Sequence, residues 1–456
     1  MEQYRPYGKL MQRERFGYAL GAIPCGLLAY IFMFKYIELF FDDLKLLPTY
    51  FIIGQVIYLI INAINDPIMG QLSDRTNRER WGSRRIVYIK YGGPIWALTF
   101  IIVWFPWSYD NQFIIFLHYV ISICIFDTML TLVVLAWMAL LPEMTPDTDE
   151  RSLVNLIIIF LGLISIVPVF IIIGTMKPTS QDFQFLMVVI AIASSILLLV
   201  VARESFEKPE FQKDEVFPFI KSLKQSLKSK SFRLYVAFNF CNIFLGGIGL
   251  SYLFIYVLVL GENFGAAIGT YIIISIIVAF ISNVFCARMR PKWGMRKIIL
   301  RFGILRALGA FILFILILNP MPLWVIWVGF TIYTFLGGYG VFSTPLFHLT
   351  FDEDELKHGT RREGMFMGIN ALIHKPALSL GPIVATIILV YFGYIQGADT
   401  QPASAYLGIK ILFFLVPAIV IAISMIFVYF HPLHGERLEE MQKALEALHK
   451  EKANRI

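Results

Sequence analysis

Residues 183–202 read FQFLMVVIAIASSILLLVVA, a run of 20 residues without a charged side chain. A helix of this length is about 30 Å long, which matches the hydrocarbon core of a bilayer. Similar runs recur along the chain, in which 58% of the residues are hydrophobic and only 16% are charged. A water-soluble domain covers its surface with more charge than this. The run therefore predicts an all-α membrane protein.

Apolar runs of this kind divide the rest of the chain into spans. We predict twelve transmembrane helices, with an error of several residues at each boundary. The predicted spans lie at residues 17–41, 48–72, 85–106, 112–141, 153–176, 183–202, 232–258, 266–289, 298–319, 322–350, 365–394 and 404–430.

The basic residues indicate how the chain is oriented in the bilayer. They gather in alternate loops, namely Arg75, Arg78, Arg80, Arg84 and Arg85, then Lys208, Lys213, Lys221, Lys224, Lys228 and Lys230, then Arg288, Arg290, Lys292, Arg296 and Lys297. Cytoplasmic loops are enriched in Lys and Arg, so we expect both termini in the cytoplasm. We expect the host membrane to be the plasma membrane. The net charge of +7 then reflects topology, and no nucleic-acid partner is expected.

The two halves of the chain are related in sequence. Trp81–Arg85 reads WGSRR, and Trp293–Lys297 reads WGMRK, 212 residues later. Arg151 and Arg362, which follow the fourth and tenth predicted spans, are 211 residues apart. This shared offset indicates a duplicated six-helix unit, a common plan in transporters. We predict an N-terminal bundle at 1–202, a cytoplasmic linker at 203–231, a C-terminal bundle at 232–430 and a cytoplasmic C-terminal helix at 431–456.

The second predicted span contains Asn62-Ala63-Ile64-Asn65-Asp66-Pro67. Positions 62, 65 and 66 fall on one helix face, and Pro67 leaves the carbonyl of Ala63 without its helical donor. Carboxylate, amide and carbonyl oxygens on one face suit a hard monovalent cation. An ionisable group inside a span also favours a functional site, because its desolvation is costly. A structural hydrogen-bond cluster near the cytoplasmic end of the span is the alternative.

These residues also carry a resemblance to a known family. The run Asn62–Gly70, NAINDPIMG, with Trp81-Gly82 and a basic pair after it, resembles the second helix and following loop of the glycoside–pentoside–hexuronide:cation symporters of the major facilitator superfamily. The resemblance continues at Leu141–Thr145 and from Arg361 to Lys375, and it ends at Gly393-Tyr394. It implies two pseudo-symmetric six-helix halves and cation-coupled symport by alternating access.

The resemblance also implies roles for single residues. The family has two acidic cation ligands one helical turn apart in the second helix; the second corresponds to Asp66, and Asn62 stands in place of the first. The family asparagine between them is present as Asn65. The acid of the first helix and the arginine of the fifth, which contact sugar in the family, have no counterpart at 21–27 and 153–176. We expect Na⁺ or H⁺ as the coupling ion and no other cofactor.

Two more ionisable residues lie inside predicted spans. Asp127, near the middle of the fourth span, must pair, bind a cation or take a proton. Lys375 matches the family lysine and is expected to face the cavity and neutralise the cation site, with a structural ion pair as the alternative. We assign the cation site to Asn62, Asn65, Asp66 and Asp127, and the substrate cavity to Asp127, Thr131, Trp137, Tyr339, His374 and Lys375.

Charged residues near the cytoplasmic loops are expected to form a gate. Ion pairs between the halves would close the inner side in the outward-open state, and a network is needed because one exposed pair contributes only about 0–1 kcal/mol. The expected gate residues are Asp74, Arg75, Arg84, Arg85, Glu143, Arg151, Arg361, Arg362 and Glu363. Lys35 and Glu38 are expected at the outer interface, where long side chains can reach water.

The sequence has no metal-ligand spacing, hydrolase triad or nucleotide motif, so neither an enzyme nor an ATP-driven pump is indicated. The leading hypothesis is ion-coupled symport of a small organic solute, with sugars and glycosides as candidates. A lysolipid or another amphiphile is the alternative cargo, and a non-transporting receptor or scaffold is the alternative class. The expected partners are the solute, the cation and membrane lipids, and we expect a monomer.

Overall fold

The computed structural model describes residues 9–74, 76–145, 148–207, 228–251, 264–319, 321–358, 363–398 and 400–454. Every regular element in these ranges is helical, which confirms the predicted all-α class. The chain divides into two compact units. Unit 1 comprises residues 1–215, 250–254 and 396–399, and unit 2 comprises residues 216–249, 255–395 and 400–456.

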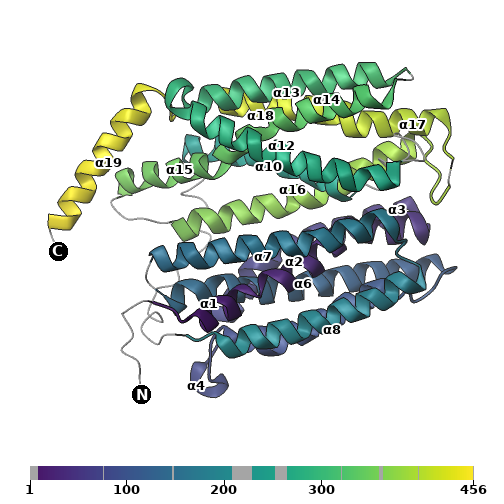
Figure 1. Cartoon of the computed structure of the whole chain (residues 1–456), viewed down its shortest axis with the longest axis horizontal. Coiled ribbons are helices and arrows are strands. Elements are labelled where there is room, and N and C mark those ends of the chain that lie inside the picture. The colour runs from purple at the N-terminus through teal and green to yellow at the C-terminus, as the bar shows by residue number, and fades with distance from the viewer. Residues whose placement is uncertain are drawn as a thin grey trace. The chain divides into compact units, whose positions relative to one another are not determined.

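Unit 1 consists of long helices that run side by side (Figure 1). Two short π-helical turns, η1 and η2, interrupt them. Its elements are α1 (Gln12–Ala19), α2 (Ala22–Ile37), η1 (Glu38–Asp43), α3 (Pro48–Asp74), α4 (Arg78–Trp81), η2 (Tyr88–Gly92), α5 (Gly93–Trp104), α6 (Gln112–Met144), α7 (Thr148–Thr175) and α8 (Gln181–Glu204).

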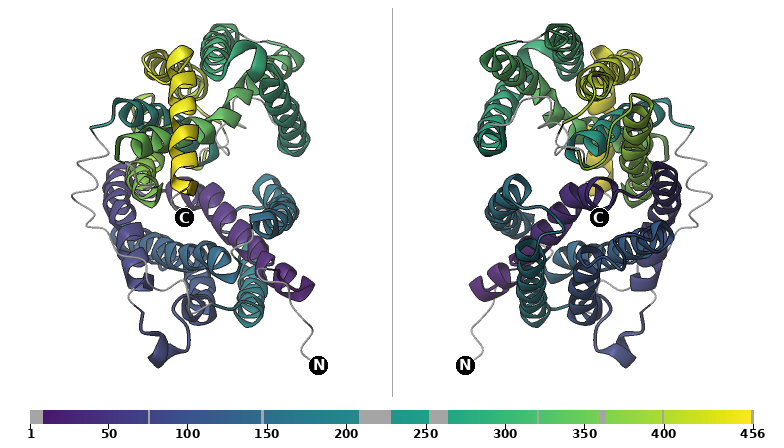
Figure 2. Two further views of the ribbon diagram at one scale, coloured as in Figure 1. Left: turned by 90° about the vertical axis from the view of Figure 1, so that its left-hand side faces the viewer. Right: turned by 90° about the vertical axis from the view of Figure 1, so that its right-hand side faces the viewer.

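Unit 2 is a second bundle, and Figure 2 shows the helices of each unit end-on. A 3₁₀ segment, η4, lies between two α-helices in its middle. Its elements are α10 (Lys230–Ser251), α12 (Phe264–Trp293), α13 (Met295–Ile317), α14 (Leu323–Phe335), η4 (Leu336–Phe342), α15 (Ser343–His358), α16 (Glu363–Tyr391), α17 (Ala403–Lys410), the π-helical η5 (Ile411–Leu415), α18 (Val416–Tyr429) and α19 (Glu436–Asn454).

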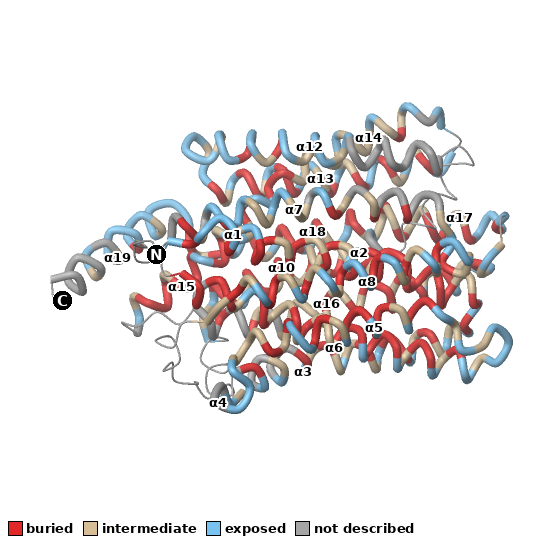
Figure 3. The backbone as a smooth tube through the Cα atoms, turned by 60° about the horizontal axis from the view of Figure 1, so that its bottom comes forward, coloured by how far each residue is buried: buried red, intermediate tan, exposed pale blue. Residues whose placement is uncertain are grey.

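Ten helical segments of the described chain are long and apolar enough to cross a bilayer, and they overlap ten of the predicted spans. Helices α5 and α7 occupy the other two, at 85–106 and 153–176. Buried and exposed positions alternate along most helices (Figure 3). On α8, for example, Met187 and Leu198 are buried while Phe185, Ile192 and Ile196 are exposed. Apolar side chains on the outer face of a helix suit contact with lipid.

Three helix pairs build unit 1, and a glycine brings each pair together. Helix α2 packs along α7, α3 along α6, and α5 along α8. A Cβ added at each glycine would lie 2.9 Å or less from a side chain of the partner helix, and these contacts are Gly26 with Ser165, Gly54 with Tyr119, and Gly93 with Leu198. Small residues allow the close approach that membrane helices need in order to pack.

Unit 2 repeats this arrangement of helix pairs. Helix α13 packs along α18, and α12 packs along η4. Helix α16 approaches α10 closely, because a Cβ at Gly247 would lie 2.4 Å from the carbonyl oxygen of Leu378. Gly303 against Met425 and Gly338 against Ser282 play the same part for the other two pairs. In both units, the first long helix therefore pairs with the fifth, the second with the fourth and the third with the sixth.

The two Trp-Gly repeats adopt similar backbone conformations. Helix α4 ends at Trp81 and α12 ends at Trp293, and the glycines that follow, Gly82 and Gly294, have φ values of 72° and 75°. Only glycine adopts such angles without strain, so both positions require it. Arg296 then donates to the carbonyl oxygens of Val428, at 3.2 Å, and of Tyr429 at the end of α18.

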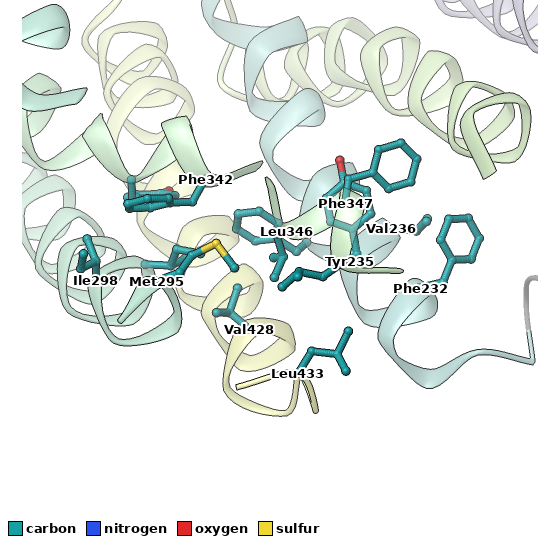
Figure 4. Close-up of a cluster of buried hydrophobic side chains, with 14 of the residues drawn as sticks. Phe232, Tyr235, Val236, Met295, Ile298, Phe342, Leu346, Phe347, Val428 and Leu433 are labelled. Carbon is teal, nitrogen blue, oxygen red and sulfur yellow. The ribbon is translucent and has the colours of Figure 1, made fainter. Parts of the chain in front are cut away.

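A hydrophobic core in unit 2 extends to the segment before α19 (Figure 4). Tyr235 of α10 stacks on Phe347 of α15 with ring centroids 4.6 Å apart. Val428 of α18 and Leu433 belong to the same cluster, as does Met441 inside α19. The first half of the C-terminal helix is therefore part of the unit 2 core.

Polar contacts hold the same junction together. Glu353 of α15 accepts a hydrogen bond from Ser231 and pairs with Lys357 at 2.9 Å and with Arg437 of α19 at 3.8 Å. His431, which precedes α19, is only 2% exposed. Burial lowers the pKa of His431 to about 4, so its imidazole is neutral at neutral pH.

The structure contradicts the interface prediction for Lys35 and Glu38. Lys35 is 2% exposed and Glu38 is 9% exposed. The ammonium of Lys35 donates to the two carboxylate oxygens of Glu38 at 2.9 and 2.7 Å, and to the carbonyl oxygen of Met176 at 2.9 Å. The prediction was wrong because these acceptors satisfy the ammonium inside unit 1, so the side chain has no need to reach water.

Candidate functional site

One face of α3 carries four polar side chains, Gln55, Tyr58, Asn62 and Asn65, which we call the α3 polar stripe. Their spacing of three, four and three residues places them in one row along the helix. All four are buried, with at most 7% of each residue exposed. Asn62 and Asn65 therefore share a face, as their spacing predicted.

Asp127 of α6 lies against this stripe. The hydroxyl of Tyr58 donates to Oδ1 of Asp127 at 3.2 Å, and Nδ2 of Asn65 donates to Oδ2 at 3.4 Å. Asp127 is 7% exposed, and Thr131, one turn further along α6, is 3% exposed. The structure therefore brings together two of the predicted cation-site residues, Asn65 and Asp127, which are 62 residues apart in the chain.

Two oxygens of the α3 polar stripe are buried without a hydrogen-bond donor among the described residues, Oδ1 of Asn62 and Oε1 of Gln55. The amide of Gln55 donates to the hydroxyl groups of Tyr36, at 3.1 Å, and of Tyr119. A buried polar atom without a partner destabilises a protein by about 1–3 kcal/mol. Such an atom next to a carboxylate is a candidate ligand for a cation.

The stripe and Asp127 have the chemistry of a site for a small cation. Asn62 lies between Tyr58 and Asn65 along the helix, and both of these contact Asp127. An amide oxygen and a carboxylate are hard ligands for a monovalent cation, and the carboxylate is also a base that can take a proton. Binding of a cation or a proton stabilises a buried carboxylate, because either one neutralises its charge.

Several predicted residues lie outside the part of the chain that the structure describes. These are the side chains of Asp66, Asp74 and Glu363, which are within α3 and α16, and the whole of Arg75, Arg361 and Arg362. Their assignment to the cation site and the gate stays a prediction.

Trp137 holds α1 and α6 together. Its indole N–H donates to the carbonyl oxygen of Tyr18 at 3.0 Å, and the hydroxyl of Tyr18 donates to the carbonyl oxygen of Trp137 at 2.9 Å. The two rings stack with centroids 5.5 Å apart. Contact with a solute in the cavity remains a prediction for this residue.

The remaining predicted cavity residues are in unit 2. His374 and Lys375 are partly exposed on α16, directly before Pro376. Tyr339 is 1% exposed in η4, next to Arg306 of α13. Their role in binding solute also stays a prediction.

The described gate residues form contacts within unit 1. Arg84 and Arg85 both pair with Glu143, at 2.6 and 2.8 Å. Glu207 accepts hydrogen bonds from the backbone N–H groups of Arg84 and Arg85 at 2.8 and 2.6 Å. Arg151 donates to the carbonyl oxygen of Thr145 at 2.8 Å. The predicted pairing between the halves remains a prediction.

Sequence reasoning missed three residues. Gln55 and Tyr58 continue the helical spacing of Asn62 and Asn65 toward the N-terminus of α3, and this periodicity is the signal that would have found them. Arg306 is an arginine within the ninth predicted span, and an ionisable residue in a span is a functional candidate by default.

The model of the family described as MFS/sugar transport protein matches residues 17–435. The chain belongs to this family. It is 22% identical to transmembrane protein 180 of Gallus gallus, over 80% of this chain and 78% of that protein. It is 24% identical to the isoprimeverose transporter of Lactiplantibacillus pentosus, over 92% of this chain and 88% of that protein. The crystal structure of a D-xylose–proton symporter matches with a TM-score of 0.65 at 12% identity, covering 92% of this chain and 97% of the other.

These similarities confirm the resemblance to the glycoside–pentoside–hexuronide:cation symporters of the major facilitator superfamily. The protein is an integral, multi-pass membrane protein and a secondary transporter rather than an enzyme. The similarity to the D-xylose–proton symporter concerns the fold alone.

Proposed function

We propose that this transporter couples the movement of Na⁺ or H⁺ to symport of a sugar or glycoside. It works by alternating access of two six-helix halves, with twelve spans and both termini in the cytoplasm. The observation that carries the proposal is the buried carboxylate of Asp127, in contact with Tyr58 and Asn65 of the α3 polar stripe, which also carries the Asn62 oxygen without a donor in the described chain.

A carboxylate inside a membrane protein is costly unless something offsets its charge. A cation or a proton bound at Asp127 would offset this charge further, in addition to the hydrogen bonds from Tyr58 and Asn65. Coupling then requires that the cation and the solute stabilise the same state of the protein, so that each increases the affinity for the other. The isoprimeverose transporter among the similar proteins supports a saccharide as the solute.

The first test is a thermal-shift panel on the purified protein, in sodium and in choline buffer. The panel contains pentoses, glycosides, hexuronides and lysolipids. A ligand that binds only the folded state stabilises it by RT ln(1 + [L]/Kd), so even weak binding is measurable at high concentration. A saccharide shift that grows with sodium supports sodium symport, and one that grows with acidity supports proton symport. A shift with lysolipids alone would replace the saccharide with an amphiphile.

The second test is uptake by proteoliposomes of the saccharide that the panel identifies. We expect Asp127→Asn and Asp66→Asn to abolish uphill uptake and to leave downhill flux or exchange in place, because a neutral amide cannot carry the coupling charge. Asp182→Asn, on the exposed first turn of α8, is the matched control and should transport normally. Unimpaired uphill uptake in both Asp127→Asn and Asp66→Asn would refute the cation site.

A further inference from the structure

Arg306 is a cation in the middle of a membrane-spanning helix. It lies halfway along α13, and its Nε is buried without a hydrogen-bond partner among the described residues. Among the described residues, the salt bridges of unit 2 involve Glu353 of α15, and none of them includes Arg306. Guanidinium groups stay charged in proteins, so this charge needs another source of stabilisation.

Aromatic and glycine residues surround this guanidinium. The ring of Tyr333 lies under it, with 4.3 Å between Cζ of Arg306 and the ring centroid. Gly337 lies on another side, where an added Cβ would come within 3.2 Å of Cζ. The phenol of Tyr339 is adjacent and interacts with the guanidinium, and its buried hydroxyl has no acceptor among the described residues.

This environment stabilises the charge only in part. A cation–π contact contributes about 0.5–2 kcal/mol, whereas an unpaired charge in a low-dielectric interior costs several kcal/mol. The Nε–H of Arg306 and the O–H of Tyr339 therefore both lack an acceptor among the described residues. An acceptor with a negative charge would satisfy them.

We propose that Arg306 and Tyr339, with Tyr333 as a platform, form a binding site for a small anionic group in unit 2. The group is a carboxylate on the transported solute or a free inorganic anion such as chloride. Arginine suits this role because its planar fork binds a carboxylate through two parallel hydrogen bonds. Gly337 makes room for the guanidinium against η4, because an added Cβ would lie 3.2 Å from Cζ and the guanidinium would have to shift. The assignment of the anion to a carboxylate on the solute rests on the proposed transport of saccharides. The anion site itself does not depend on that proposal.

Thermal shifts with anionic and neutral probes test the site. Glucuronate is compared with glucose, and chloride is compared with the bulky HEPES anion at equal sodium concentration. We expect one of the two anions to stabilise the wild-type protein and Arg306→Gln to weaken its apparent affinity at least about tenfold. Arg301→Gln is the matched control, because Arg301 is exposed on the same helix over Trp293. It should bind like the wild type.

Two further variants keep the test decisive if Arg306→Gln does not fold. Arg306→Lys retains the charge but loses the fork, and Tyr339→Phe removes only the hydroxyl; both should weaken the anion-dependent shift. Glucuronate dependence assigns the anion to the solute, and chloride dependence assigns it to an inorganic ion. Equal shifts in wild type, Arg306→Lys and Tyr339→Phe, or no anion-dependent shift in the wild type, would overturn the site. Uptake of neutral xylose is measured in parallel, because its coupling to a cation tests the proposed symport independently of Arg306.

Discussion

At position 62 the chain has an amide where the family resemblance implies an acid, and the structure describes the surroundings of this amide. The amide oxygen is buried on the α3 polar stripe and has no donor in the described chain. Asp127 is then the one carboxylate whose contacts with the stripe are described, and Tyr58 and Asn65 both donate to it. Hydrogen bonds to an ionised group favour the ionised form. These two donors therefore help to keep Asp127 ready for a cation.

Tyr58→Phe tests this role of the tyrosine. It removes one donor to a buried carboxylate, a hydrogen bond that contributes about 1.5–3 kcal/mol when the acceptor is charged. We expect lower thermal stability and a changed cation dependence. Half-maximal stabilisation should need a higher sodium concentration or, if the coupling ion is a proton, a lower proton concentration, because loss of the donor favours the protonated carboxyl. Tyr50→Phe is the control, because Tyr50 lies in the first turn of α3 with its ring stacked on Phe116. Identical cation dependence of the two variants would contradict the role of Tyr58.

At the scale of elements, close contact at glycine determines which helices pair. Gly247 lies against the backbone of Leu378, whereas Gly246, its neighbour on α10, has nothing within 4 Å of an added Cβ. The two residues have the same helix propensity, so the difference between them is a difference in packing alone. This makes them a matched pair for measuring how much the α10–α16 contact contributes.

We expect Gly247→Ala to lower the free energy of unfolding by about 1–3 kcal/mol, because the added methyl group forces α16 away from α10. Gly246→Ala should be neutral or stabilising by up to about 1 kcal/mol, because alanine favours the helix. Melting temperatures of the two variants in the same detergent provide the comparison. A larger loss for Gly246→Ala would mean that the described α10–α16 packing is wrong.

The elements were the most predictable part of this protein, because apolar runs of bilayer length leave few alternatives to helices. The π-helical turns η1, η2 and η5 were not predicted, since their hydrogen-bond register depends on packing against neighbouring helices. The error at Lys35 has the same origin. Its acceptors, Glu38 and the carbonyl oxygen of Met176, come together only when α2 lies along α7.

At the scale of the whole molecule, each unit has its own set of three helix pairs. The first boundary between the two units falls between residues 215 and 216. Each unit contains the contacts that stabilise its own helices, so a chain break at this point should leave both bundles intact.

Co-expression of residues 1–215 and 216–456 as separate chains tests this independence. We expect the two fragments to insert, to co-purify and to retain saccharide uptake, with lower stability because the link between them is lost. A break at Gly294 is the control, since it separates α12 from α13 inside unit 2. Fragments divided at Gly294 should yield less folded protein. Equal yields from the two divisions would show that the units are not the folding modules.

The site was predictable only in part, because its contacts join residues that are far apart in the sequence. The helical spacing of Asn62 and Asn65 and the isolated charge of Asp127 identified these residues as candidates. Asn65 and Asp127 are 62 residues apart in the chain, and they come into contact because α3 packs along α6. Arg306 shows the opposite case, since its charge within a span was visible in the sequence while its neighbours Tyr333 and Tyr339 became known only from the fold.

The buried junction before α19 has a practical consequence for anyone who labels this protein. Met441 is the last described residue in the unit 2 core, and α19 continues to Asn454. The 13 residues after Met441 extend the helix by about 20 Å. A fluorescent protein fused after α19 would be held away from the core by a rigid helix. Trimming the chain back past Met441 would cut into the core itself.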